Sequence, residues 1–264
     1  MISVWVLPNS FYFSNCYLSK IFDNNLAEIS QREGARLKKE ASEVEPFFVG
    51  NVPIQFEAKL TLTDVKTKNY WSETGVAMAS CYSCTATPKE MGERTHEKFD
   101  DLTEEAEALG FANCHLKMAT WRWLKKICCA RCYQKYSRTT KEDYASYDQN
   151  EKEMLDALKE EPFKLKISTD GRTITGPIAK SAFEHPEALA TIFHCPLDLL
   201  EDLLILIQTL DCGDMVDWEK FKASCDNWLD RFHQSPIAWC WLPPTLHFML
   251  HHGWQVTNIT ISYS

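Results

Sequence analysis

Two short motifs of cysteine and histidine, set far apart in the chain, constrain how it can fold. The first is Cys81-Tyr-Ser-Cys84, and the second is His247-Phe-Met-Leu-His251-His252. Two thiols three positions apart, with two imidazoles four or five positions apart, are a typical ligand set for tetrahedral zinc. Four protein ligands close such a site, so a structural Zn2+ would hold an early turn against a late helix. Neither motif is specific by itself, and the alternative is a set of free or packing cysteines with ordinary surface histidines.

The composition is typical of a globular protein from a reducing compartment. The chain has 264 residues, of which 45% are hydrophobic and 25% charged, enough to bury one large core or two small ones. Its 11 cysteines are an odd number without the spacing of a disulfide framework, so we expect reduced thiols and an intracellular location. The first 13 residues lack the basic region of a signal peptide, and no apolar run is long enough to span a membrane. We therefore expect no membrane partner.

Charge is distributed unevenly along the chain. The formal net charge is −9, yet no acidic residue occurs between Glu107 and Glu142. Basic side chains contact phosphates and aromatic rings stack on bases, so this stretch can bind nucleic acid such as DNA. The alternative is a solvated helix whose tryptophans pack inward and whose charges are neutralised by acidic helices on either side. The candidate nucleic-acid-binding residues are Lys117, Arg122, Lys125, Lys126, Arg131 and Lys135, interleaved with Trp121, Trp123, Tyr133 and Tyr136.

Periodicity predicts an α+β chain that is predominantly helical. Alternating apolar positions predict a strand over 52–62, and a short strand or hairpin over 163–174, where Asp170-Gly171 indicates a turn. Apolar spacing of the helical kind, with prolines suited to the first helical position, predicts helices elsewhere. These helices cover 31–45, 97–109, 113–136, 141–161, 197–210 and 217–232, with a short helix from Pro177 and a last one, introduced by Pro243-Pro244, that carries the histidines.

Four blocks of the sequence, taken in order, carry a family resemblance. They are Cys81 to Met91, residues 111–126 with His115, Thr169-Asp-Gly-Arg-Thr173 followed by residues 179–183, and Pro243 to Gly253. This series resembles the transposases related to the V(D)J recombinase catalytic subunit, including Transib-like elements. The resemblance implies a partial RNase H-like core with a helical insertion, clamped by zinc, over residues 46–264, after a poorly defined segment at 1–45. It also implies a nuclear protein related to DNA recombination, whose partners are DNA, another protein or a second copy of the chain.

The identity of the fourth zinc ligand is open from geometry. The resemblance implies the ligands Cys81, Cys84, His247 and His252. On a straight α-helix, however, residues four apart point the same way, which favours His251, whereas residues five apart diverge by well over a right angle. We expect His252, because Gly253 suggests that the helix ends there and that its last turn can deform.

The resemblance also implies an active site that this chain does not preserve. Enzymes of this family cut and join DNA with two divalent ions, such as Mg2+, held by three carboxylates. The first lies upstream of any matched block, and the second should follow His115 by two residues, where Lys117 stands. The third lies downstream of the histidines, so we expect it to be missing from a chain that ends at Ser264. Asp64 and Asp170 are better explained as turn residues than as replacements.

Three functions therefore remain open from the sequence. The first is a truncated, degenerate and catalytically inactive transposase derivative that binds zinc and retains a surface for DNA or a partner. The second is an active, Mg2+-dependent transposase or nuclease, and the third is a helical interaction module without nucleic acid. Cys129-Ala-Arg-Cys132, next to Cys128, is a rival metal motif or a set of packing cysteines.

Overall fold

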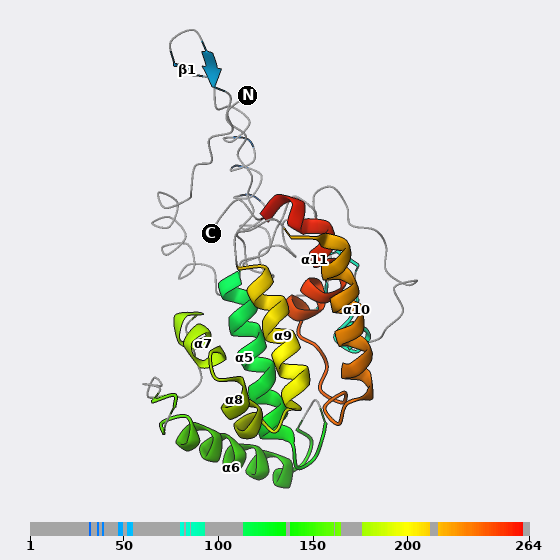
Figure 1. Cartoon of the computed structure of the whole chain (residues 1–264). Helices are drawn as coiled ribbons and strands as arrows, with labels where there is room; N and C mark the ends of the chain where they lie inside the picture. Colours follow the sequence, from blue (N-terminus) through cyan, green and yellow to red (C-terminus); the bar gives the residue numbers. More distant parts are fainter. Residues whose placement is uncertain are drawn as a thin grey trace.

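The computed structural model (Figure 1) shows a helical body formed by helices between residues 113 and 260. The residues that it describes are 32, 36, 39, 47–49, 52–54, 80, 81, 83, 84, 86–92, 113–135, 138–160, 162–164, 176–211 and 216–260.

Helices follow one another from residue 113 onwards in the described part of the chain. They are α5 (Asn113–Ala130), α6 (Lys141–Ala157), α7 (Gly176–Phe183), α8 (Pro186–Phe193), α9 (Leu197–Thr209), α10 (Trp218–Gln234) and α11 (Pro244–Thr260), preceded by a short 3-10 helix, η2 (Glu90–Gly92). The predicted predominance of helices is confirmed. Of the helices that the structure describes, none has the length and apolar character needed to cross a bilayer.

Two short strands form an antiparallel hairpin ahead of the helices. β1 (Phe47–Val49) pairs with β2 (Val52–Ile54), so that Phe47 lies opposite Ile54 and Val49 opposite Val52. The strand predicted over 52–62 is confirmed over its first residues, and its remainder lies outside the described residues. The predicted helix at 97–109, most of the one at 31–45 and the predicted strand beyond Lys164 also lie outside them.

Helix α5 is central to the helical body, where it contacts α6, α7, α8, α9 and α11. Figure 1 shows α5 alongside α9. On one face, Leu116, Leu124 and Ile127 are at most 1% exposed. The Trp123 ring, on the same face, packs against Phe232 of α10 with 5.8 Å between ring centroids. Trp121, on another face, meets Phe193 of α8 with 5.1 Å between ring centroids. Apolar side chains on more than one face bury α5 on several sides, as expected for a core helix.

Local signals place most helix ends. The Thr140 hydroxyl accepts a hydrogen bond from the Asp143 backbone N–H at 3.1 Å, and the Asp143 carboxylate accepts one from the Thr140 N–H, also at 3.1 Å. This capping box starts α6 at the predicted position. Asp217 caps α10 by accepting from the Lys220 N–H at 3.2 Å, and α11 begins at Pro244.

Three predicted helix ends are wrong. Helix α6 ends at Ala157 rather than at Glu161. Helix α5 ends at Ala130 rather than near 136, and it is followed by a turn and by Gln134 with a positive φ of 47°. Helix α11 does not end at Gly253 but continues to Thr260. A glycine inside a helix costs only about 1 kcal/mol relative to alanine, so one glycine does not end a helix that is packed against neighbours.

Candidate metal centre

The cysteine motif lies in a tight turn that is stabilised by hydrogen bonds of its own backbone and of the residues that follow it. The Cys81 N–H donates to the Ala86 carbonyl oxygen at 2.9 Å, which closes a turn that contains Ser83 and Cys84. After it, the Glu90 carboxylate accepts hydrogen bonds from the Thr87 N–H at 2.9 Å and the Thr87 hydroxyl at 2.8 Å. A threonine paired with a glutamate three residues later is typical of a helix start, and η2 follows. The turn therefore presents both thiols from an ordered local frame.

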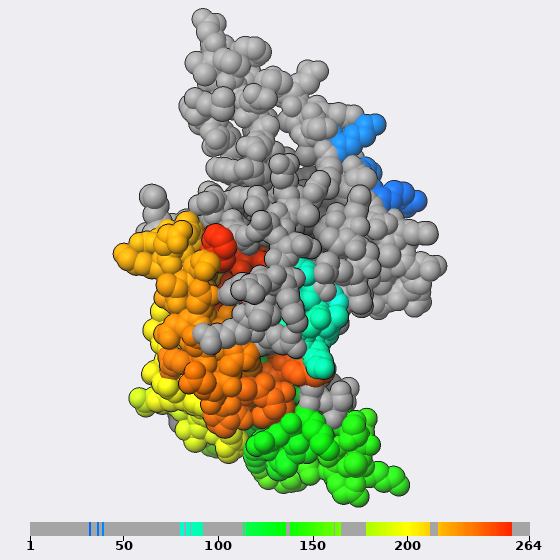
Figure 2. Space-filling view, turned by 90° about the vertical axis from the view of Figure 1, so that its right-hand side faces the viewer, coloured from blue at the N-terminus to red at the C-terminus, as the bar shows by residue number. Residues whose placement is uncertain are grey.

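The histidines come from helix α11, which lies against this turn. Helix α11 contacts η2, α5 and α10, and Figure 2 shows part of the segment around residues 80–92 (cyan) next to the C-terminal region (orange to red). Nδ1 of His247 is 3.0 Å from the carbonyl oxygen of Met91, so in the neutral ring it is Nδ1 that carries the proton and donates it. Nε2 then offers its lone pair, and it lies 3.2 Å from Sγ of Cys84.

Four side chains converge on one point. The ligand atoms of Cys81, Cys84, His247 and His252 all lie within 4.8 Å of one another. Zinc bound to two sulfurs and two nitrogens has ligand separations of roughly 3.3–3.8 Å at ordinary bond lengths, so small side-chain rotations suffice to close the site. All four residues are buried, with His247 fully covered. Among the described residues, this is the only cluster of three or more cysteine, histidine, aspartate or glutamate side chains that is close enough to hold a metal ion.

His252, rather than His251, completes this group, but not through the deformed helix end that the sequence suggested. The helix is continuous through both residues, so the convergence arises within an unbroken α11. The rings of His247 and His252 lie edge to face with 5.5 Å between centroids. The ring of His251 is tilted relative to that of His247, with 4.4 Å between their centroids, and His251 is a buried neighbour of the group.

The protonation of the two thiols differs. Burial raises the pKa of Cys81, but hydrogen bonds with Cys84, His247 and His252 outweigh burial and hold this pKa well below its usual value. The pKa of Cys84 is raised, first by its hydrogen bond to Cys81 and then by burial. The hydrogen bond between the two sulfurs thus favours loss of the first proton from Cys81 rather than from Cys84. Metal ligands of this kind release protons when a cation binds.

Much of the predicted nucleic-acid-binding set is engaged inside the fold. Lys117 is buried and forms an ion pair with Asp211, just after α9, and Lys125 forms one with Glu151 of α6. Arg131 binds Glu153 of α6 with 2.8 Å between Nη2 and Oε2.

The three other members of that set differ in their exposure to solvent. Arg122 and Lys135 are exposed. The Lys126 ammonium lies 5.6 Å from the centre of the Tyr147 ring, and partial burial lowers its pKa. The number of positive charges that this basic stretch exposes to solvent is therefore smaller than the sequence suggests.

The tryptophans of α5 pack inward, as the alternative interpretation of this helix predicted. Trp121 is 6% exposed and meets Phe193 of α8 edge to face, with 5.1 Å between centroids. Trp123 is 3% exposed, and its indole N–H donates to the Cys240 carbonyl at 3.2 Å. Neither ring is available for stacking on a base. Tyr133 is partly buried, and Tyr136 lies outside the described residues.

The pairs of Lys125 and Arg131 with α6 agree with the alternative of neutralisation by an adjacent acidic helix, whereas the partner of Lys117 was missed. Asp211 is 94 residues from Lys117, and it also accepts a hydrogen bond from the Asn113 amide at 3.2 Å. Nothing in the local sequence of either residue indicates this pairing. The carbonyl oxygen of Met91, which orients His247, is a backbone atom and leaves no sequence signal. Asp64 and Asp170 lie outside the described residues.

No family model matches the chain, and no curated protein matches it either.

Proposed function

We propose that this chain is a zinc-stabilised protein derived from the transposases related to the V(D)J recombinase catalytic subunit, and that it lacks their DNA-cutting activity. The observation that carries the proposal is the buried group of two cysteines and two histidines, drawn from segments 163 residues apart. It occurs in the two blocks where the resemblance places the zinc ligands. The ordered series of sequence blocks supports the same assignment, and with it a partial RNase H-like core and a nuclear location.

Zinc suits this donor set better than the other common divalent ions. Thiolate and imidazole ligands favour zinc, whereas Mg2+ and Ca2+ require oxygen ligands. Four protein ligands leave no open position for water or substrate, which is typical of a structural site. The hydrogen bond from His247 to the Met91 carbonyl supports this, because ligand histidines are usually oriented by such a second contact. The ion would hold the cysteine turn against α11.

The residue that supports a loss of DNA-cutting activity is Lys117. The resemblance places a carboxylate ligand for a catalytic ion at this position, and this chain has an ammonium group there, paired with Asp211. A positive charge at such a position repels a divalent cation, and the Asp211 carboxylate is occupied by its ion pair with Lys117. We therefore propose no Mg2+-dependent cleavage.

The first test measures metal directly. We expect about one zinc ion per purified chain by elemental analysis, and loss of that zinc in Cys84→Ser and His252→Ala. His251→Ala is the matched control, because it removes a neighbouring buried imidazole outside the ligand group. Replacement with Co2+ gives a second reading that does not depend on stability, since tetrahedral sulfur and nitrogen ligands produce strong visible absorption. A folded chain without zinc, or zinc lost in His251→Ala but kept in His252→Ala, would refute the assignment.

A second function has an observation in its favour. The ion pairs of Lys117, Lys125 and Arg131 with residues on α6 and after α9 reduce the charge available to phosphates. A helical protein-interaction module without nucleic acid fits this better than an extended DNA surface does. Binding of a labelled duplex across a salt series separates the two, because phosphate contacts make affinity fall steeply with salt.

A further inference from the structure

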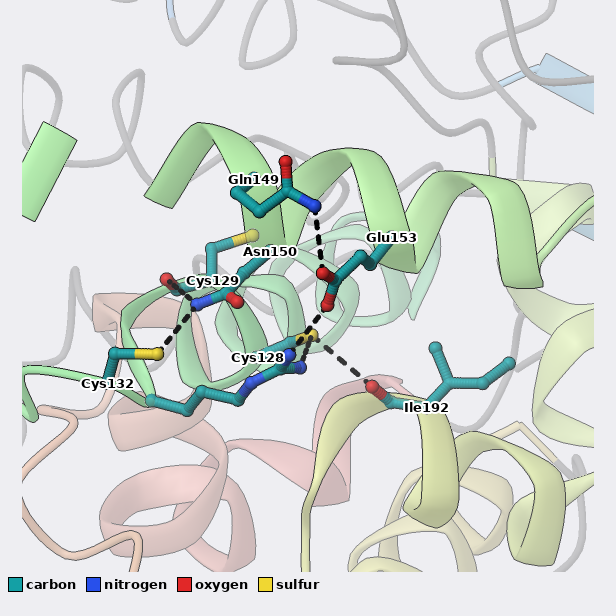
Figure 3. A network of polar contacts seen from close by, with 8 residues as sticks. Cys128, Cys129, Cys132, Gln149, Asn150, Glu153 and Ile192 are labelled. Atoms are coloured by element: carbon teal, nitrogen blue, oxygen red, sulfur yellow. Dashed lines mark hydrogen bonds and ion pairs between the residues drawn. The ribbon is translucent and has the colours of Figure 1, made fainter. Parts of the chain in front are cut away.

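Three cysteines meet at the C-terminal end of α5, away from the metal group. Cys128 and Cys129 are fully buried, while Cys132 lies two residues past the last residue of the helix and is exposed. Figure 3 shows this cluster between α5 and α6, with Ile192 of α8 nearby. All three thiols are free. The cluster therefore combines buried thiols with one that solvent can reach.

Asn150 of α6 holds Cys132 beside Cys129. Its buried amide nitrogen donates to the carbonyl oxygen of Cys129 at 3.0 Å and to the sulfur of Cys132 at 3.4 Å. The two cysteines are three residues apart, which places their α-carbons about 5 Å apart at the end of a helix, within the range that a disulfide bridges. The N–H groups of Tyr133 and Gln134 donate to the Ala130 carbonyl oxygen and hold the turn after the helix, so the sulfurs close the remaining distance by side-chain rotation.

Cys128 faces a different neighbour. Its thiol donates to the Ile192 carbonyl at 3.3 Å, and Nη1 of Arg131 lies 3.7 Å from its sulfur. Arg131 is in turn fixed by Glu153. Cys128 therefore contacts α8 in addition to the neighbouring Cys129, whereas Cys129 and Cys132 are both hydrogen-bonded to Asn150 of α6. The pKa of Cys128 is lowered, first by a hydrogen bond with Cys129 and also by Arg131, against the opposing effect of burial.

We propose that Cys129 and Cys132 form a reversible redox pair that closes to a disulfide when a hydroperoxide oxidises the protein. The exposed Cys132 thiolate attacks the peroxide, forming a sulfenic acid and releasing an alcohol or water. The Cys129 sulfur then displaces the sulfenic hydroxyl group, which leaves as water with the Cys129 proton. Two thiols are oxidised by two electrons and one peroxide bond is reduced.

The order of these steps follows from the surroundings. Cys132 reacts first because it is the exposed thiol of the cluster. Cys129 reacts second, because its hydrogen bond to Cys128 and its burial raise its pKa and keep it protonated. Closing the disulfide removes the sulfur of Cys132 as an acceptor for Asn150 and restrains the turn between α5 and α6.

The positions of the basic residues make the pair directly measurable. Trypsin cuts after Lys126, Arg131 and Lys135, so Cys129 and Cys132 fall in different peptides, Ile-Cys-Cys-Ala-Arg and Cys-Tyr-Gln-Lys. The zinc-loaded full chain is reduced, treated with hydrogen peroxide, blocked with an alkylating reagent and digested. We expect the two peptides joined by one disulfide, and their release by dithiothreitol. A dimedone adduct on Cys132, trapped before the disulfide forms, marks it as the first thiol to react.

Matched variants assign the partners. The joined peptide should be lost in Cys129→Ala and Cys132→Ser and retained in Cys128→Ala, with circular dichroism confirming that each variant is folded. The wild-type result does not depend on these variants, so a folding defect in one of them leaves the test intact. Oxidation of Cys132 to sulfinic acid without a joined peptide would overturn the proposal. So would a joined peptide that persists in Cys129→Ala, which would make Cys128 the partner.

Discussion

His247 contacts the main chain of Met91 across 156 residues of sequence, with 3.0 Å between its Nδ1 atom and the carbonyl oxygen. This hydrogen bond fixes the ring so that its other nitrogen lies 3.2 Å from the Cys84 sulfur. The same contact joins η2 to the first turn of α11. The cysteine turn and α11 are thus joined by protein contacts in addition to the proposed metal site.

Removing the metal should therefore destabilise the contact between these two segments. A ligand present at 100 times its dissociation constant stabilises the folded state by about 2.7 kcal/mol, so a strong chelator should lower the midpoint of thermal unfolding by several degrees. Differential scanning calorimetry with and without chelator measures this, and re-addition of zinc should restore the midpoint. An unchanged midpoint after confirmed zinc loss would contradict a stabilising role.

Breaking the ion pair of Lys117 should loosen the junction between α5 and the end of α9. Lys117→Met removes the ammonium group and leaves the partly buried Asp211 carboxylate without its cationic partner. We expect this to lower the free energy of unfolding by about 1–3 kcal/mol. Asp211→Asn gives the reciprocal change. In urea unfolding the double variant should cost less than the sum of the two single variants. Strict additivity would show that the two side chains do not interact.

The capping box of α6 should make part of the stability depend on pH. Thr140→Ala removes the acceptor for the Asp143 N–H and should cost about 1 kcal/mol. Hydrogen bonds from the Thr139 backbone, first, and from the Thr139 hydroxyl and Thr140 backbone hold the pKa of Asp143 below its usual value. A depressed carboxyl pKa contributes stability above the unfolded pKa of about 3.9 and loses it as the pH falls toward the folded value.

The matched variant for that pH effect is Asp143→Asn, which keeps the side chain's size and removes its titration. Unfolding curves are compared between about pH 6 and about pH 3, which covers the titration of carboxyl groups. The variant should lose less stability over this range than the parent chain does. Equal losses in both would place the acid sensitivity elsewhere.

Binding to DNA, where it occurs, should depend on the exposed cations of the basic stretch. Arg122→Ala with Lys135→Ala should weaken duplex binding and reduce the salt slope by about 0.9 for each phosphate that is no longer neutralised. Lys125→Ala with Arg131→Ala is the matched control, because these residues already pair with Glu151 and Glu153. A larger effect in the control pair would show that the ion pairs open on binding, and no binding at low salt would favour the interaction module.

The regular elements could be predicted from the sequence to the extent that their signals are local. Helix α9 ends within one residue of its predicted end, and α10 begins one residue after its predicted start at Asp217. Apolar spacing, an acidic cap and helix-starting prolines act over a single turn, so the local sequence contains them in full. The end of α5 could not be predicted in this way, because Ala130 carries no terminating signal.

The sequence by itself determined that this chain is mainly helical and that two cysteines and two histidines are its candidate metal ligands. Only the tertiary structure decided that His252 and not His251 joins Cys81, Cys84 and His247, and that the α5 tryptophans lie in the core. It also decided that Lys117 is paired with Asp211. These outcomes depend on residues far apart in the sequence, such as Lys117 and Asp211, 94 residues apart, and Cys84 and His247, 163 residues apart. Their approach is set by packing of the whole helical body and not by any local pattern.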